Sequence, residues 1–134
     1  MIYVLDTNVL SEQTKSDPAP EVADFLRRLP VENVRISAMV LGEIAQGVEN
    51  NPTPGLKKFL AEVLTLPVAG FGEKEALEWG RITSAALARG REVTARDAII
   101  AATASAHNWT VATRNAADFR ALGVKVFNPW RDRP

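Results

Sequence analysis

Residues 1–12 read MIYVLDTNVLSE, and this stretch decides how the rest of the chain is interpreted. Ile2 to Leu5 form an unbroken apolar run, which is typical of a strand buried on both faces of a parallel sheet. The run stops at Asp6, and Thr7 to Gln13 has the pattern of a short helix. A strand that ends on a charged residue has two explanations. Asp6 is either the N-cap of the helix that follows or a metal ligand at the end of the strand.

Beyond this stretch, strand-like and helix-like segments alternate to the end of the chain. We expect strands at 34–37, 66–71, 109–115 and 124–129, and helices at 20–29, 38–50, 56–64, 73–89, 97–107 and 116–122. This alternation predicts an α/β fold with a mainly parallel central sheet and helices on both faces. Because no interior linker interrupts it, residues 1–134 are expected to form a single domain.

The composition restricts the chemistry that the chain can perform. It contains no cysteine and one histidine, His107, which excludes disulfides, thiolate metal sites and paired-histidine mechanisms. Sixteen basic residues balance sixteen acidic ones, so any contact with nucleic acid must use a local patch or a partner's charge. No apolar run approaches the ~20 residues of a membrane span, and no signal peptide is recognisable. We therefore expect a cytoplasmic protein with no membrane contact.

Four carboxylates are expected to meet at one edge of such a sheet. Asp6 and Asp118 follow predicted strands, Asp97 opens the apolar helix at 97–107, and Glu43 lies about two turns into the helix at 38–50. Ligand sites in open α/β sheets form outside the carboxyl ends of the strands. Clustered carboxylates repel one another, and a divalent cation removes that repulsion.

The chemistry of these ligands favours a hard metal. Oxygen-only ligands indicate Mg²⁺ or Mn²⁺, which polarises a phosphate and activates water for hydrolysis. The alternative is structural. Asp6, Asp97 and Asp118 would then be helix caps or first-turn acids, and Glu43 would lie on a solvated face.

Four segments of the chain, taken in order, resemble the successive motifs of PIN-domain nucleases, and in particular the toxins of the VapC and FitB type. They are YVLDTNVLSE (3–12), SAMVLGEIAQGVE (37–49), RDAIIAATASAH (96–107), and VATRNAADF with GVKVFNPW (111–130). The resemblance covers the chain from residue 1 to about Trp130. It implies a Mg²⁺- or Mn²⁺-dependent endoribonuclease that forms a homodimer and acts on an RNA substrate. It also implies a small antitoxin, encoded beside it, that blocks the enzyme and supplies any contact with DNA.

Carried over residue by residue, the resemblance assigns Asp6, Glu43 and Asp97 as catalytic metal ligands. Asn115 stands where many relatives carry an acid, so Asp118 is expected to be the fourth ligand. Relatives are often blocked by an antitoxin arginine that reaches into the acid cluster, and the same is expected here.

Other polar residues are expected to support this site. Thr7, Asn8, Thr113 and Asn115 would orient the ligands or hold a water molecule; otherwise the first three are ordinary residues at a helix start or a strand end. Arg96 and Arg114 flank the proposed site and would contact RNA phosphates, unless they are simply solvated.

The leading interpretation is therefore the ribonuclease toxin of a type II toxin–antitoxin pair. One alternative is a component of an antitoxin-dependent DNA-binding repressor complex with little nuclease activity. The other is a PIN nuclease of RNA processing. A homodimer is expected because the apolar stripe from Leu56 to Leu64, beside a helix that carries Trp79, leaves surface for a second copy.

Overall fold

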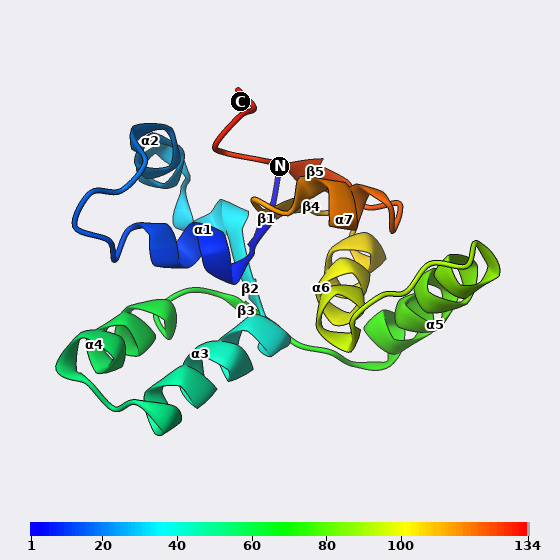
Figure 1. Ribbon diagram of the computed structural model, residues 1–134, viewed down its shortest axis with the longest axis horizontal. Helices are drawn as coiled ribbons and strands as arrows, with labels where there is room; N and C mark the ends of the chain where they lie inside the picture. Colours follow the sequence, from blue (N-terminus) through cyan, green and yellow to red (C-terminus); the bar gives the residue numbers. More distant parts are fainter. Residues whose placement is uncertain (134) are drawn as a thin grey trace.

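The computed structural model describes residues 1–133, and its elements follow the expected alternation (Figure 1). The strands are β1 (Tyr3–Leu5), β2 (Val34–Ser37), β3 (Val68–Ala69), β4 (Thr110–Ala112) and β5 (Lys125–Phe127). The helices are α1 (Thr7–Glu12), α2 (Pro20–Arg28), α3 (Ala38–Asn50), α4 (Pro54–Val63), α5 (Glu73–Ala88), α6 (Ala95–Ala106) and α7 (Ala116–Arg120). A 3-10 turn, Val31–Asn33, leads into β2.

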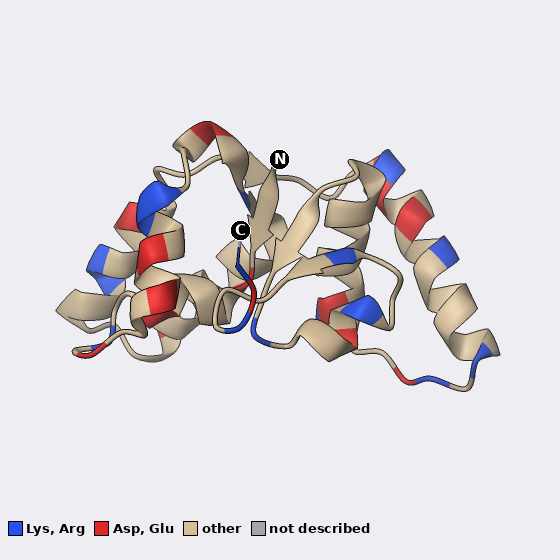
Figure 2. Ribbon diagram, turned by 90° about the horizontal axis from the view of Figure 1, so that it is seen from above, with Lys and Arg blue, Asp and Glu red and all other residues tan. Residues whose placement is uncertain are grey.

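The five strands form one sheet in the order β3-β2-β1-β4-β5, and every neighbouring pair is parallel. The chain moves outward from β1 to β2 and β3, then crosses back to β4 on the other side of β1. Because crossovers between parallel strands are right-handed, this reversal places helices on both faces of the sheet. Figure 2 shows them on both sides, so the predicted α/β architecture is confirmed.

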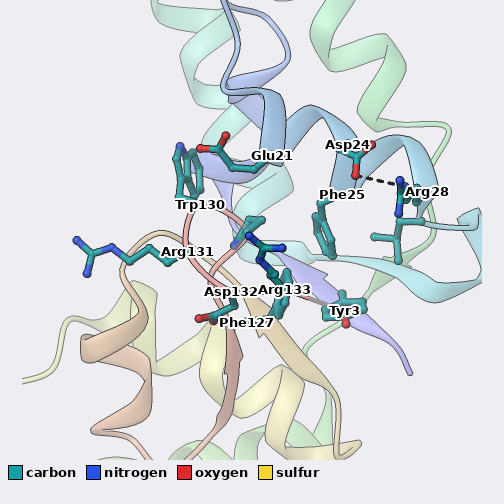
Figure 3. A pocket seen from close by; sticks show the side chains of 12 residues that line it. Tyr3, Glu21, Asp24, Phe25, Arg28, Phe127, Trp130, Arg131, Asp132 and Arg133 are labelled. Atoms are coloured by element: carbon teal, nitrogen blue, oxygen red, sulfur yellow. Dashed lines mark ion pairs between the residues drawn. The ribbon is translucent and has the colours of Figure 1, made fainter.

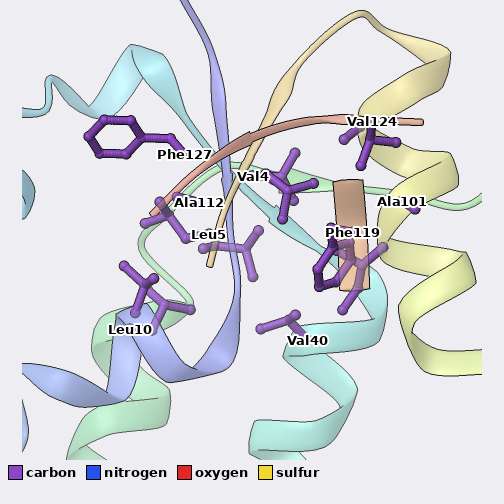
Figure 4. Close-up of a cluster of buried hydrophobic side chains, with 14 of the residues drawn as sticks. Val4, Leu5, Leu10, Val40, Ala101, Ala112, Phe119, Val124 and Phe127 are labelled. Atoms are coloured by element: carbon purple, nitrogen blue, oxygen red, sulfur yellow. The ribbon is translucent and has the colours of Figure 1, made fainter. Parts of the chain in front are cut away.

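The core lies between the sheet and the helices that cover it. Val4 and Leu5 of β1, Val111 of β4 and Phe119 of α7 are buried, and they pack into one apolar cluster (Figure 4). Fully burying side chains of this size contributes about 1.5–3 kcal/mol each. The sequence of β1 is apolar on both faces because both faces of the strand are covered.

Helix α6 is apolar almost all round because it lies between the sheet and α5 (Figure 1). Ala98 and residues 100–104 are all buried. The helix begins at Ala95, two residues earlier than expected from the sequence. The reason is a cap: the hydroxyl oxygen of Thr94 accepts a hydrogen bond of 3.1 Å from the backbone N–H of Asp97. Arg96 therefore lies in the first turn of α6, beside Asp97.

Several large apolar side chains are exposed, and three of them lie on α5. Leu77 and Leu87 are 72% and 78% exposed, and Trp79 of the same helix is 38% exposed. By contrast, most of the apolar stripe of α4 packs inward, because Phe59 and Val63 are buried. Among residues 1–133, no helix is long and apolar enough to cross a membrane.

Candidate functional site

The candidate site lies where the strand order reverses. Strands β1 and β4 are neighbours in the sheet but are followed by helices that turn away in opposite directions, which is the usual position of a site in an open parallel sheet. Asp6 follows β1 directly, and Thr113 follows β4. The backbone N–H of Asp6 donates to the carbonyl of Ala112 at 3.0 Å, so the register of the sheet holds the two strand ends together.

Asp6 is completely buried, and the structure confirms the first of the two explanations for its position. It is the N-cap of α1, since its Oδ1 accepts a hydrogen bond of 2.8 Å from the N–H of Thr7. Its Oδ2 accepts a hydrogen bond of 2.7 Å from the hydroxyl of Thr113. A buried carboxylate with two such partners is held in one orientation at the end of the strand.

Arg96 brings three of the four predicted ligands together. Its Nη2 lies 2.5 Å from Asp6 Oδ1, its Nε lies 2.6 Å from Glu43 Oε2, and its Nη1 lies 2.9 Å from Asp97 Oδ1. The three carboxylates come from the end of β1, from α3 and from α6, so only the fold makes them neighbours. One guanidinium thus faces three acids, which leaves the cluster with an excess of negative charge.

The environment of Arg96 keeps its guanidinium charged. Partial burial acts to lower the pKa of Arg96, since it disfavours the charged form. The hydrogen bonds and charges of Glu43 and Asp6 act in the opposite direction and outweigh it, so the net pKa of Arg96 is raised. The carboxylates therefore face a permanent cation.

Thr7 links two of the acids. Its backbone N–H is bonded to Asp6, and its hydroxyl donates to Glu43 Oε1 at 3.2 Å. The same hydroxyl oxygen lies 3.5 Å from Arg96 Nη2. Thr7 is therefore placed to orient Glu43 relative to Asp6.

A second set of hydrogen bonds surrounds Thr113. Its hydroxyl oxygen accepts from the backbone N–H of Asn115 at 3.0 Å and lies 3.5 Å from the side-chain nitrogen of Asn8. The side-chain oxygen of Asn8 accepts from the backbone N–H of Arg114 at 3.2 Å. These bonds tie the start of α1 to the loop after β4, next to the Asp6 oxygen that Arg96 does not bind.

Two of the predicted site residues lie outside this cluster. Asp118 is exposed in the first turn of α7, and in the described part of the chain no hydrogen bond or ion pair involves its carboxylate. The guanidinium of Arg114 lies over the ring of Trp130, 4.8 Å from its centroid. The assignments of Asp118 to a metal and of Arg114 to RNA stay predictions.

The donor set suits a hard divalent cation, but its present arrangement suits a guanidinium. The buried Asp6, with Glu43 and Asp97, offers only oxygen atoms, which Mg²⁺ and Mn²⁺ prefer. Yet among residues 1–133 no three acidic or histidine side chains are positioned to hold one ion together. The ion pairs with Arg96 explain this, because each carboxylate points at a different nitrogen of the same flat group. Sequence reasoning missed this role of Arg96; its only local signal was a cation beside Asp97.

A pocket lies elsewhere on the molecule, away from the acid cluster. This pocket of about 630 Å³ opens between α2 and the C-terminal segment, and Tyr3, Phe25, Phe127 and Trp130 are among its lining residues (Figure 3). Its carboxylate Asp24 is paired with Arg28 at 3.2 Å. It shares no residue with the acid cluster, and both acidic and basic side chains line it.

Comparisons with known proteins agree with this geometry. Residues 3–125 match the PIN domain family. Toxin FitB of Neisseria gonorrhoeae is 41% identical over 98% of this chain and all of its own length. VapC ribonuclease Y4jK of Sinorhizobium fredii is 31% identical over 96% of this chain and 98% of its own. In the solved structure of FitAB bound to an IR36 DNA fragment, a chain with 35% identity superposes with a TM-score of 0.90, covering 99% of both chains.

The fold and the site define an α/β protein with an acidic cluster at the carboxyl edge of a parallel sheet. This chain belongs to the PIN-domain family, and within it to the FitB and VapC type.

Proposed function

We propose that the chain is a Mg²⁺- or Mn²⁺-dependent endoribonuclease and the toxin of a type II toxin–antitoxin pair. The observation that carries this proposal is the meeting of Asp6, Glu43 and Asp97, from three separate elements, at the carboxyl edge of β1 and β4. The VapC ribonuclease among the relatives supports the choice of RNA as substrate.

In this proposal the acids are the metal ligands, and neighbouring hydroxyl groups orient the acids. Asp6, Glu43 and Asp97 are the ligands, with Asp118 as a fourth that must turn toward them. When bound, the ion polarises the phosphate and makes water a better nucleophile. Thr7 and Thr113 fix the carboxylate orientations through the hydrogen bonds described above.

Residues of the loop after β4 contact the substrate and a water molecule in this proposal. Asn115 offers an amide to a water molecule at the rim of the site. Arg114 contacts an RNA phosphate as a charge-assisted donor. Its exposed position next to Thr113 supports this role, since the phosphate must approach the acids from solvent.

The decisive test is RNA cleavage by wild type, Asp6→Asn and Asp97→Asn, each with Mn²⁺ and with EDTA. We expect cleavage only with metal, and a loss of at least about 10²-fold in each variant, as the loss of a metal ligand commonly produces. Asp17→Asn is the matched control, because Asp17 is an exposed loop residue outside the cluster. Full cleavage in EDTA would exclude the metal mechanism.

The partner in this proposal is a small antitoxin. Because the toxin has no net charge, the antitoxin supplies the contact with DNA, in keeping with the DNA-bound FitAB complex. An arginine of the antitoxin inhibits by pairing with Glu43 or Asp97, since its planar fork binds carboxylates well. The DNA-bound complex also favours a second candidate function, a repressor complex with little nuclease activity, which the cleavage assay separates from the first.

The exposed face of α5 supports the proposal of a homodimer. Trp79 and Leu87 lie about two turns apart on one side of α5, and both are exposed, whereas Leu77 faces the side of the helix opposite Trp79. A two-fold pairing of α5 faces would cover Trp79 and Leu87 in both copies. In this proposal the dimer surface lies on α5 rather than on the apolar stripe of α4.

A further inference from the structure

The position of Arg96 is not explained by its own helix. It lies in the first turn of α6, where the partial positive charge of the helix end disfavours a cation. Its side chain is only 26% exposed, so it also gives up much of its hydration. What stabilises it there is the cluster of Asp6, Glu43 and Asp97.

The guanidinium of Arg96 pairs with the three carboxylates in three different directions. Each of its three nitrogen atoms takes a different carboxylate, at 2.5, 2.6 and 2.9 Å. An ammonium group would be unable to divide its bonds in this planar way, because it is a compact point charge. Arg96 therefore fills the centre of the cluster.

A metal ion and this guanidinium exclude each other at the centre. Mg²⁺ requires oxygen ligands at about 2.0–2.1 Å. The bonded oxygen atoms of Asp6, Glu43 and Asp97 lie 2.5, 2.6 and 2.9 Å from three different nitrogen atoms of the guanidinium, which occupies the space between them. The carboxylates close on an ion only after Arg96 has moved out.

We propose that Arg96 is a built-in counter-cation: it offsets part of the negative charge of the acid cluster when no divalent cation is bound, and a divalent cation enters only by displacing it. This inference rests on the proposed metal-dependent function. It adds that metal affinity is set partly by the ion pairs that must break, and that the metal-free fold is held together by Arg96.

The test measures metal binding and stability, without any RNA. Mn²⁺ is titrated calorimetrically into metal-free wild type, Arg96→Gln and Arg96→Lys. Arg96→Gln is expected to bind Mn²⁺ at least about tenfold more tightly, because a competing charge at contact distance is gone. Arg96→Lys keeps the charge but not the planar set of donors, so its Mn²⁺ affinity is expected to lie between those of wild type and Arg96→Gln. Should Arg96→Gln fail to fold, Arg96→Lys against wild type decides the question in the same direction.

Arg114→Gln is the matched control. It removes the same charge from an exposed neighbour of the site whose guanidinium contacts Trp130 instead of the acids. Its Mn²⁺ affinity is expected to stay within about threefold of wild type, because exposed charges are screened. A gain as large as that of Arg96→Gln would mean that net charge alone matters, and would overturn the inference.

Thermal melting gives a second readout. In EDTA, Arg96→Gln is expected to melt below wild type, because three carboxylates then face one another without a cation. Mn²⁺ is expected to raise its melting temperature by more than it raises that of wild type. Unchanged or weaker Mn²⁺ binding in both Arg96 variants would overturn the inference.

The inference and the proposed function fail in different ways. If wild type cleaves RNA with Mn²⁺ while Arg96→Gln binds Mn²⁺ no better, the inference is wrong and the function stands. If Arg96→Gln gains Mn²⁺ affinity while no variant or wild type cleaves RNA, the inference stands and the proposed nuclease activity is wrong.

Discussion

Thr113→Val tests whether the buried hydrogen bonds around Asp6 hold the site together. Valine has nearly the shape of threonine, so the change removes a hydroxyl without opening a cavity. The hydroxyl donates to the buried Asp6 Oδ2 at 2.7 Å and accepts from the N–H of Asn115 at 3.0 Å. The substitution therefore leaves a charged oxygen and an amide without their partners.

The expected loss of stability follows from these two bonds. A hydrogen bond to a charged group contributes about 1.5–3 kcal/mol, and leaving the buried carboxylate oxygen unpaired makes the upper part of that range appropriate. The Asn115 N–H belongs to an exposed residue that water can reach, so it adds up to about 1 kcal/mol. We expect Thr113→Val to lower the free energy of unfolding by about 2–4 kcal/mol.

The assay is equilibrium urea unfolding in EDTA, with the same m-value required for both proteins compared. Thr103→Val is the control, because Thr103 is equally buried but its hydroxyl donates only to the carbonyl of Ile99 in its own helix, at 2.8 Å. That variant is expected to lose less than about 1 kcal/mol, since the carbonyl belongs to the helix ladder. Equal losses in the two variants would refute the argument that the bond to Asp6 is special.

Three further predictions concern regions outside the acid cluster. Hydrogen bonds from the N–H of Gly72 and with the side chain of His107 lower the pKa of Glu75 in the folded protein. The ionised Glu75 therefore contributes its full stability above the ordinary glutamate pKa of about 4.3, and this contribution is lost as pH falls through the lower pKa of the folded state. Glu75→Gln should flatten the fall of the melting temperature below that pH. Leu87→Glu on α5 should give a monomer by light scattering at micromolar concentration where wild type gives a dimer, and a wild-type monomer would exclude the dimer. Gly123→Ala should lower the free energy of unfolding by about 1 kcal/mol or more in urea, because Gly123 has a φ of 81°, and no change would contradict this.

Much of the fold was predictable from local pattern. The apolar run before Asp6 identifies a strand covered on both faces, and the apolar residues of α6 identify a helix buried on nearly every side. Both conclusions hold because the faces of a segment that are buried can be predicted from the apolar residues along the segment itself. The predicted start of α6 was wrong by two residues. The apolar run that begins after Asp97 suggested a start at residue 97, but the hydroxyl of Thr94 caps the helix and lets it begin earlier.

For the site too, some features follow from the sequence and others only from the fold. The sequence by itself determined which residues carry carboxylates and that Asp6 ends a strand, because residue type and strand periodicity are local properties. Only the tertiary structure decided that Arg96 binds Glu43 and Asp6, which lie 53 and 90 positions away along the chain. It also left Asp118 exposed on α7, outside the cluster. A long side chain has many rotamers, and the one it adopts depends on which charges the packed elements bring within reach, so no local pattern records the partner.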